Sequence, residues 1–436
     1  MTLGCAKNLV DSENMLGLLK AEGFDLVPDL AEADIGIVNT CGFIESAVEE
    51  SVKTILEVAA MKNAGKLKEL YVVGCLTQRF GYKLKRELPE VDGWLGTGEI
   101  NRIAHLVSKR GRGEAPFLIS KPTFLADHKT PRLQSSPFYT AYVKIAEGCS
   151  HRCSYCTIPS IRGPLRSRPP GSVLSEVLEM AGRGVKEINL IAQDTTAYGR
   201  DLGGDASLED LIESLVSVEG IEWIRILYSH PEGISTRLRE LMDSYEKICP
   251  YLDIPLQHVD SGILERMGRN EGGETALELV DRIRATKRSI SLRTTFMVGF
   301  PGETERAFEK LYDFVSLAQF DHLGVFVYSP EKGTRAARLG HGVERRVAEK
   351  RRDILMRLQA GISLEKHQRM VGKIFPVLIE GACEETDLLL RGRTATMAPD
   401  VDAQVLINEG DADAGEIVPV RIREAHAYDL VGEIMG

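Results

Sequence analysis

The apolar and polar positions of the first hundred residues follow two alternating periods, which predict strands followed by helices. Buried strands are expected at the short apolar start that reaches Leu3 and at residues 35–38 and 70–73. Asp11 or Ser12 is expected to cap the helix that follows the first strand. Apolar residues recur at helical spacing in this helix and in the next one, at Met15, Leu18, Leu19 and Phe24, then at Ile44, Val48, Val52, Ile55 and Ala59. This strand–helix order predicts an open parallel sheet.

A longer alternation of strands and helices begins near residue 141. Six apolar runs separated by helical stretches are expected to form strands, at residues 141–145, 187–191, 223–227, 252–255, 294–298 and 323–327. Strands that alternate with helices in this way form parallel sheets. Six such units fit a partial (β/α)6 barrel better than a closed barrel of eight strands.

The last part of the chain has a different pattern. Residues 343–373 form a charged stretch that predicts a long connecting helix. Short apolar runs separated by turn residues follow it, at residues 376–379, 387–390, 405–407 and 417–422. Such runs predict a small antiparallel β-barrel. We therefore expect an α/β protein with three domains, at residues 1–125, 135–365 and 370–436.

Composition narrows the class of protein. The 436 residues carry a formal net charge of −10, which disfavours a generic nucleic-acid binder because such binding depends on Lys and Arg. No segment approaches the ~20 apolar residues of a membrane-spanning helix, and the start of the chain lacks the apolar core of a signal peptide. We expect a cytoplasmic protein without a membrane partner, whose eight cysteines are metal ligands or free thiols rather than disulfides.

Three cysteines gather in one loop after the first strand of the predicted barrel. Cys149, Cys153 and Cys156 are separated by steps of four and three residues, so one metal centre can take all three thiolates. Zinc sites usually have four ligands in two pairs, and no fourth ligand stands at a suitable spacing here. A four-iron cluster held by three cysteines leaves one iron free for a substrate. A zinc knuckle or three structural thiols are the alternatives.

This motif resembles the radical S-adenosylmethionine superfamily. The resemblance implies a 4Fe-4S cluster that binds S-adenosylmethionine and cleaves it to a 5′-deoxyadenosyl radical, which abstracts hydrogen from an unactivated carbon. It also implies cofactor contacts at Tyr155, at Gln193 and Asp194 after the second barrel strand, and at Gly299 and Gly302 in a glycine turn. Ordinary loop polarity and capping are the alternatives for these polar residues.

Three further cysteines share one structural position although they are far apart in the chain. Cys5, Cys41 and Cys75 each follow the carboxyl end of a predicted parallel strand. In an open parallel sheet these ends lie side by side and form a ligand-binding crevice. Neighbouring glycines such as Gly4 and Gly74 allow the backbone to approach a bulky centre closely. We expect the three thiols to meet there, and three buried core cysteines are the alternative.

The N-terminal motifs resemble the methylthiotransferases, and the resemblance covers essentially the whole chain, with a TRAM domain as the C-terminal barrel. The matching segments are Gly4-Cys5-Ala6-Lys7-Asn8, Asn39-Thr40-Cys41-Gly42-Phe43-Ile44 and Val73-Gly74-Cys75. The resemblance implies that Cys5, Cys41 and Cys75 hold a second 4Fe-4S cluster, where the inserted sulfur is methylated, so that S-adenosylmethionine is used twice. It also implies a reducing electron donor of the flavodoxin or ferredoxin type. The first strand is short by comparison, so Met1 need not be the natural start.

Two branches of this family differ in substrate. The MiaB type modifies an adenosine of transfer RNA, whereas the RimO type modifies the β-carbon of an aspartate in the twelfth small-subunit ribosomal protein. The opening Gly-Cys-Ala-Lys-Asn resembles the RimO type. From Lys373 onward the chain has thirteen acidic and five basic residues, which suits a basic ribosomal protein better than RNA. We expect the RimO type, with the MiaB type as the alternative enzyme, and we do not expect transfer RNA as a partner.

Two points stay open at the level of sequence. Arg162, Arg166 and Arg168 lie in a loop rich in proline and glycine, and they either touch substrate or are solvated. A non-catalytic iron–sulfur protein is the remaining functional alternative, and the predicted barrel argues against it because an electron carrier needs no substrate cavity. No acid–base residue is expected to dominate the reaction, since its difficult step is homolytic.

Overall fold

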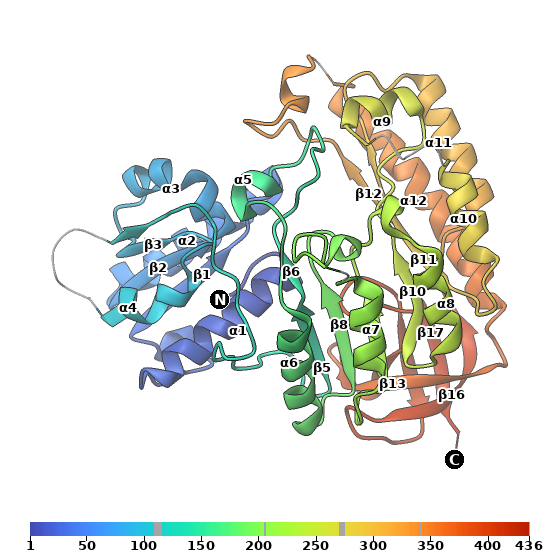
Figure 1. Cartoon of the computed structure of the whole chain (residues 1–436), viewed down its shortest axis with the longest axis horizontal. Helices are drawn as coiled ribbons and strands as arrows, with labels where there is room; N and C mark the ends of the chain where they lie inside the picture. Colours follow the sequence, from blue (N-terminus) through green and yellow to red (C-terminus); the bar gives the residue numbers. More distant parts are fainter. Residues whose placement is uncertain (109–115, 205, 270–274, 341, 436) are drawn as a thin grey trace.

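The computed structural model describes residues 1–108, 116–204, 206–269, 275–340 and 342–435. Figure 1 shows its three parts: a blue N-terminal α/β domain, a central sheet covered by helices, and a red C-terminal β-barrel. In the described residues, no helix combines the length and the apolar character needed to cross a membrane.

The N-terminal domain is an open parallel sheet flanked by helices, as predicted. Neighbouring strands all pair in parallel. In sheet order they are β1 (Ile35–Thr40), β2 (Glu69–Gly74), β3 (Gly93–Leu95) and β4 (Phe117–Leu118). The predicted first strand is reduced to a parallel bridge between Thr2 and Asn39. The helices are α1 (Ala6–Ala21), α2 (Glu45–Asn63), α3 (Cys75–Glu87) and α4 (Ile103–Ser108).

The start of α1 differs from the prediction. The helix begins at Ala6 with Cys5 as its N-cap, and Asp11 and Ser12 are buried inside it. The Asp11 carboxylate accepts a hydrogen bond from Arg162 at 2.6 Å. The Ser12 hydroxyl accepts one from the side-chain amide of Asn39 at 2.9 Å. The prediction of a cap at either residue is wrong, because their polar groups serve contacts between distant parts of the chain.

The central domain is an open sheet of six parallel strands, which confirms the partial barrel. All six predicted strands are present, although β10 begins earlier than predicted. In sheet order they are β12 (His322–Val327), β11 (Ser291–Val298), β10 (Ile248–Asp253), β9 (Trp223–Ile226), β8 (Glu187–Ile191) and β5 (Thr140–Lys144). The helices of this domain are α6 (Pro170–Gly182), α7 (Leu208–Val216), α8 (Thr236–Ser244), α9 (Ser261–Met267), α10 (Ala276–Arg284), α11 (Glu305–Ala318) and the predicted long connector α12 (Arg345–Gln368).

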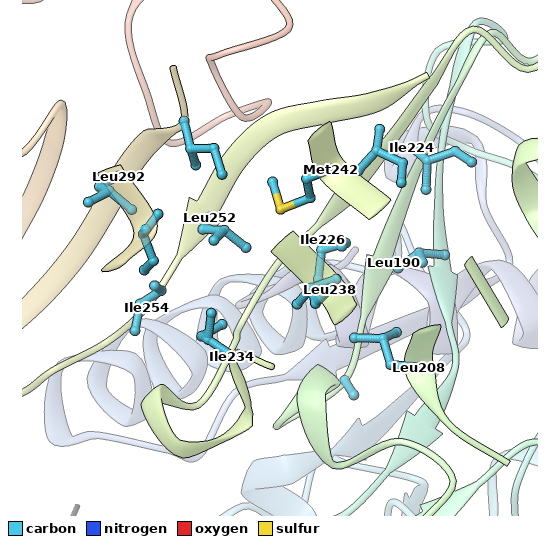
Figure 2. Packing of buried hydrophobic residues seen from close by; sticks show 14 of the residues in the cluster. Leu190, Leu208, Ile224, Ile226, Ile234, Leu238, Met242, Leu252, Ile254 and Leu292 are labelled. Atoms are coloured by element: carbon cyan, nitrogen blue, oxygen red, sulfur yellow. The ribbon is translucent and has the colours of Figure 1, made fainter. Parts of the chain in front are cut away.

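Aliphatic side chains fix the helices on the outer face of this sheet. Leu190, Ile226 and Leu252 of the strands lie in one buried cluster with Leu208 of α7 and Leu238 of α8 (Figure 2). Burying one such side chain stabilises the fold by ~1.5–3 kcal/mol. This packing holds the carboxyl ends of the strands in place, and the candidate site lies at those ends.

The C-terminal domain is a small closed β-barrel, as predicted. In barrel order its strands are β13 (Ile374–Cys383), β14 (Thr386–Thr394), β15 (Gln404–Glu409), β17 (Asp429–Ile434) and β16 (Ile417–Ala425). The sequence does not predict β17, because Gly432 interrupts its apolar alternation. Five strands cannot all alternate in direction around a ring, and accordingly β15 and β17 pair in parallel whereas the other pairs are antiparallel.

Buried charges join the C-terminal barrel to the inner face of the central sheet. Glu187 of β8 accepts hydrogen bonds from Arg225 of β9 at 3.1 Å and from Arg393 of β14 at 2.8 Å. All three side chains are at most 3% exposed. Burial raises the pKa of the Glu187 carboxyl, but Arg393 and Arg225 outweigh this effect and lower it to about 2. The two domains therefore share one ionic core.

Candidate active site

The three N-terminal cysteines lie at neighbouring strand ends. Cys5 caps α1, Cys41 directly follows β1, and Cys75 follows β2 as the first residue of α3. Gly4 has a φ of +91°, and a side chain there would lie 2.8 Å from Cβ of Cys41. A side chain at Gly42 would lie 2.9 Å from the carbonyl carbon of Cys75. The three loops are thus in direct contact, and their glycines permit this approach.

The three thiols differ in their surroundings. Cys5 is exposed, Cys41 is half-buried and Cys75 is buried. Burial raises the pKa of Cys75 to about 12, while Arg162 opposes the rise and the two neighbouring thiols add to it. Burial also raises the pKa of Cys41. Nearby protein atoms act on Cys5 in the same direction despite its exposed surface, but Lys7 and Arg162 outweigh them and lower its pKa.

The barrel cysteines lie in the loop between β6 (Ala146–Glu147) and α5 (Ile158–Arg162), and all three are half-buried. Burial raises the pKa of Cys149 to about 11 and that of Cys156 to about 12, and Cys153 adds to both increases. These thiols therefore lie within electrostatic reach of one another. A cationic centre would stabilise their ionised form.

Both cysteine sets fit a 4Fe-4S cluster. Within the described residues, no group of three or more His, Cys, Asp or Glu side chains has the spacing to hold a single metal ion. Each set does offer three thiols that affect one another's pKa and that include solvent-accessible members. A four-iron cluster takes its thiolates at different irons, so it suits a wider set than one ion does.

A buried network of charges connects the two cysteine sets. Arg162, in α5 just after the barrel cysteines, donates to Sγ of Cys75 at 3.2 Å, to Asp11 at 2.6 Å and to Glu147 at 3.3 Å. The alternative of a solvated loop is therefore wrong for Arg162. It is also wrong for Arg168, which is 4% exposed. The N-terminal domain supplies the thiol and one carboxylate, and the barrel supplies the arginine.

Gln193 and Asp194 follow β8 and lie beside the barrel cysteine loop. Gln193 Nε2 donates to Glu147 at 2.8 Å, and its Oε1 atom is buried without a hydrogen-bond partner. Asp194 Oδ2 lies 2.6 Å from Nε2 of His151, whose ring stacks on His230 with centroids 4.1 Å apart. No sequence pattern marks a role for His151, because this stack joins residues that are too distant in the chain for a local pattern to reveal.

Packing holds the remaining residues that the resemblance assigns to cofactor binding. Tyr155 meets Phe300 edge to face, with ring centroids 6.5 Å apart. Gly299 and Gly302 have φ angles of +79° and +94°, a conformation that favours glycine. A side chain at Gly299 would lie 2.6 Å from Cβ of Ala348 in α12. The backbone geometry of this turn is therefore enough to require glycine, whether or not a cofactor binds there.

The loop after β12 contacts the barrel cysteine loop directly and reaches the loop after Cys41 through Arg79. Glu331 accepts a hydrogen bond from Nη1 of Arg79 at 2.9 Å. The same nitrogen donates to the backbone carbonyl of Gly42, next to Cys41, at 2.9 Å. The N–H of Ala336 donates to the carbonyl of Ser154, inside the barrel cysteine loop, at 2.9 Å. We call residues 331–336 the bridging segment. Its partners are remote in sequence, so no motif marks it.

Two non-glycine residues at the ends of neighbouring barrel strands have left-handed backbones. Tyr228, after β9, has a φ of +61°, and Gln257, after β10, has a φ of +69°. Bulky residues rarely adopt this conformation, and such residues concentrate at functional sites. Sequence patterns carry no signal for it, so both residues are absent from the site predicted above.

Known proteins resemble this chain along its whole length. Residues 1–96 match the uncharacterized protein family UPF0004, residues 143–315 the radical SAM superfamily and residues 371–435 the TRAM domain. Proteins named ribosomal protein uS12 methylthiotransferase RimO, from Syntrophotalea carbinolica and Geobacter sulfurreducens, are each 50% identical over 436 residues. These matches cover 100% of this chain and 96% and 98% of the two relatives. The chain belongs to the RimO-type radical S-adenosylmethionine methylthiotransferases.

Membership in this family confirms the prediction of a methylthiotransferase, and the non-catalytic alternative is wrong. A relative of the same name from Desulfotalea psychrophila is 48% identical over 436 residues, covering 100% of this chain and 98% of the relative. Among solved structures, the radical S-adenosylmethionine methyltransferase TsrM from Kitasatospora setae matches with a TM-score of 0.55 and 14% identity, over 87% of this chain and 77% of that one. At this identity the likeness concerns the fold alone.

Proposed function

We propose that this enzyme attaches a methylthio group to the β-carbon of an aspartate in ribosomal protein uS12. The observation that carries the proposal is the contact of Arg162, six residues after Cys156, with the thiol of Cys75 in the other domain at 3.2 Å. Relatives that match the whole chain are named for methylthiotransfer to uS12. The proposal includes a cytoplasmic enzyme with domains at residues 1–125, 135–365 and 370–436.

Two 4Fe-4S clusters and two molecules of S-adenosylmethionine serve the proposed reaction. The cluster ligands are Cys5, Cys41 and Cys75 in the N-terminal domain and Cys149, Cys153 and Cys156 in the barrel. The barrel cysteines would hold the cluster that, with S-adenosylmethionine, supplies radical chemistry at the β-carbon, and the N-terminal cysteines would hold the cluster that supplies the methylated sulfur. A flavodoxin or ferredoxin supplies the electron.

Side chains around the barrel cysteines prepare the proposed cofactor site. Glu147 orients Gln193 and leaves its buried Oε1 atom free to accept a hydrogen bond. His151 orients Asp194 in the same way. Tyr155 and the turn that contains Gly299 and Gly302 complete the proposed site. Binding of S-adenosylmethionine would satisfy the polar atom that the protein leaves unpaired.

The C-terminal barrel presents an acidic surface that suits a basic ribosomal protein. In the described part of this domain, the exposed basic residues are Lys373 and Arg423. The exposed acidic residues are Glu384, Glu385, Asp400, Glu409, Asp411, Asp413, Glu416 and Glu424. Complementary charge speeds encounter and disfavours partners of like charge. We propose that this surface recruits the substrate and that transfer RNA is not a partner.

Mass spectrometry of the aspartate-bearing peptide of uS12 tests the proposed function. Reconstituted enzyme with S-adenosylmethionine and reductant should replace one hydrogen of the aspartate with a methylthio group. Cys41→Ala should abolish the product while leaving S-adenosylmethionine cleavage, and Cys153→Ala should abolish both. Cys383→Ala, a buried cysteine in the C-terminal barrel, is the matched control and should keep both. Methylthiolation of transfer RNA in place of uS12 would reject the proposal.

A further inference from the structure

In the part of the chain that the structure describes, a lysine beside the N-terminal cysteine set has no acidic partner. Lys7 lies in the first turn of α1, two residues after Cys5, and is 8% exposed. Its Nζ atom lies 3.1 Å from the ring centroid of Tyr228. Within the described residues, no carboxylate lies within 4.0 Å of this ammonium group. Buried ammonium groups are normally paired, because leaving water without an ion partner is costly.

The aromatic contact places Lys7 at the meeting of the two domains. Lys7 belongs to the N-terminal domain, whereas Tyr228 follows strand β9 of the barrel. The left-handed backbone of Tyr228 is held by its N–H group, which donates to Oδ2 of Asp253 at 3.2 Å. A cation over an aromatic face is attracted by the ring, and the N–H donors that point away from the ring stay available. The ammonium is thus fixed in position and still able to bind an anion.

The nearby protein carboxylate is already engaged. Asp253 Oδ1 lies 3.7 Å from Nε of Arg293, and Oδ2 accepts the Tyr228 N–H. Burial raises the pKa of Asp253, and Arg293 and, more weakly, Lys7 oppose that rise. The ammonium therefore lies within electrostatic reach of Asp253 without forming an ion pair with it.

We propose that Lys7 binds the side-chain carboxylate of the substrate aspartate. This inference rests on the proposed function, in which the sulfur donor lies on the Cys5 side and the radical source on the barrel side. The substrate carbon must lie between them, and Lys7 bridges that boundary. The β-carbon of aspartate is bonded directly to the carboxylate carbon, so a fixed carboxylate also fixes the reacting carbon.

The carboxylate of S-adenosylmethionine is the other possible source of the same chemistry. Two observations favour the substrate: Lys7 stands on the N-terminal domain next to Cys5, whereas the proposed cofactor residues Gln193 and Asp194 are oriented by Glu147 and His151 of the barrel. The experiment below distinguishes the two sources.

Binding of labelled uS12 with Asp or Asn at the target position tests the inference. The full chain, reconstituted and not reduced, is titrated by fluorescence anisotropy. Wild-type enzyme should prefer Asp by about tenfold or more, as a hydrogen-bonded charge pair would give. Lys7→Met and Lys7→Gln should lose the preference, and Lys7→Arg should keep most of it. Lys20→Met, at an exposed lysine of the same helix, should leave the preference unchanged.

Three outcomes would overturn the inference. Variants at Lys7 with wild-type iron content that keep the full Asp preference would show that Lys7 does not bind this carboxylate. A fall in affinity for S-adenosylmethionine with an unchanged Asp preference would assign Lys7 to the cofactor. Failure of wild-type enzyme to bind either form of uS12 would reject the proposed function itself, and the inference with it.

Discussion

At the scale of single residues, the site contains a positive charge that is buried between two domains rather than exposed to solvent. Arg162 is 2% exposed and contacts a cysteine thiol together with the carboxylates of Asp11 and Glu147. Its planar guanidinium can serve several acceptors at once, which a lysine ammonium does with less directional control. Arg162 therefore supports the N-terminal cysteine set from the other domain.

Replacing Arg162 should empty the N-terminal cluster site first. In Arg162→Met, Asp11 and Glu147 become buried carboxylates without this partner next to Cys75, and breaking a buried pair costs ~3–5 kcal/mol. Anaerobic reconstitution should then yield about four irons per chain, compared with about eight for wild type. Iron analysis and the absorption spectrum measure the difference.

Arg183→Met is the matched control for this loss. Arg183 is exposed and pairs with Glu179 at the C-terminal end of α6, so its removal should leave the iron content unchanged. Lys144 pairs with both Asp11 and Glu147, so adding Asp11→Asn to Arg162→Met removes the excess negative charge and should restore part of the iron. Full iron content in Arg162→Met alone would contradict this account of the site.

Single residues also differ in how far the sequence reveals them. Cys41 and Cys75 could be placed in advance, because each follows a strand with a clear apolar run and parallel strands end side by side. Lys7 and Tyr228 could not, since their contact joins two domains and depends on a left-handed backbone. A polar residue near the start of a helix can also be mistaken for its cap, as the buried Asp11 shows.

At the scale of elements, the bridging segment sets the relation between the two cysteine loops. The Arg79–Glu331 ion pair is mostly buried, with exposed fractions of 7% and 10%. Buried pairs are much stronger than exposed ones when one partner is lost. Because the bridging segment is bound at both of its ends, it keeps the loop after Cys41 and the barrel cysteine loop at a fixed distance from each other.

Glu331→Gln should uncouple the two half-reactions. Glutamine retains an oxygen acceptor but loses the charge that pairs with Arg79, so the N-terminal domain should move relative to the barrel. We expect iron content and S-adenosylmethionine cleavage near wild type, with several-fold less methylthiolated product per 5′-deoxyadenosine. Glu57→Gln, at an exposed residue of α2, should leave this ratio unchanged. An unaltered ratio in Glu331→Gln would mean that the bridging segment has no positioning role.

Low pH should weaken the interface between the central sheet and the C-terminal barrel. Because Arg393 and Arg225 hold the pKa of Glu187 at about 2 against the effect of burial, the carboxylate stabilises the fold at every pH above its unfolded pKa of ~4.3. This contribution, on the order of 3 kcal/mol, is lost as pH falls from ~4.3 towards ~2. Urea unfolding of the cluster-free protein should show the advantage of wild type over Glu187→Gln shrinking across that window. A constant advantage would contradict the assignment.

At the scale of the whole molecule, the three parts were predictable but their docking was not. Strand and helix periods identify the sheet, the partial barrel and most of the C-terminal barrel, because each depends on local repetition. The ionic core of Glu187, Arg225 and Arg393 joins residues from separate domains. Charged residues in strand patterns read as surface positions, so the sequence offers no sign that they are buried together.

Reversing charge on the C-terminal barrel should act on encounter rather than on catalysis. Glu409, Asp411 and Asp413 are exposed, so single pairs should contribute only ~0.2–1 kcal/mol each and their combined field should matter. The triple change to Lys should slow association with uS12 and flatten its salt dependence, measured by stopped-flow fluorescence. Glu416 stays, because its carboxylate accepts the Asp413 N–H at 3.0 Å.

Binding of transfer RNA is the second measurement of this experiment, and the triple variant should change it in the opposite direction. Added lysines should strengthen any contact with phosphates, so the triple variant should gain affinity for RNA. Wild type that binds transfer RNA more tightly than uS12, with a steep loss as salt rises, would favour the MiaB type of substrate.

The contact of Arg162 with Cys75 also constrains how the enzyme is made. During synthesis the N-terminal domain leaves the ribosome first, and domains generally fold in that order. The thiols of Cys5, Cys41 and Cys75 are then present, but the guanidinium that supports them is translated only after the barrel cysteines. The first domain is thus completed by a later one, so maturation of its cluster should follow docking of the barrel segment. A chain truncated before residue 158 should fold its first sheet and still fail to retain iron there.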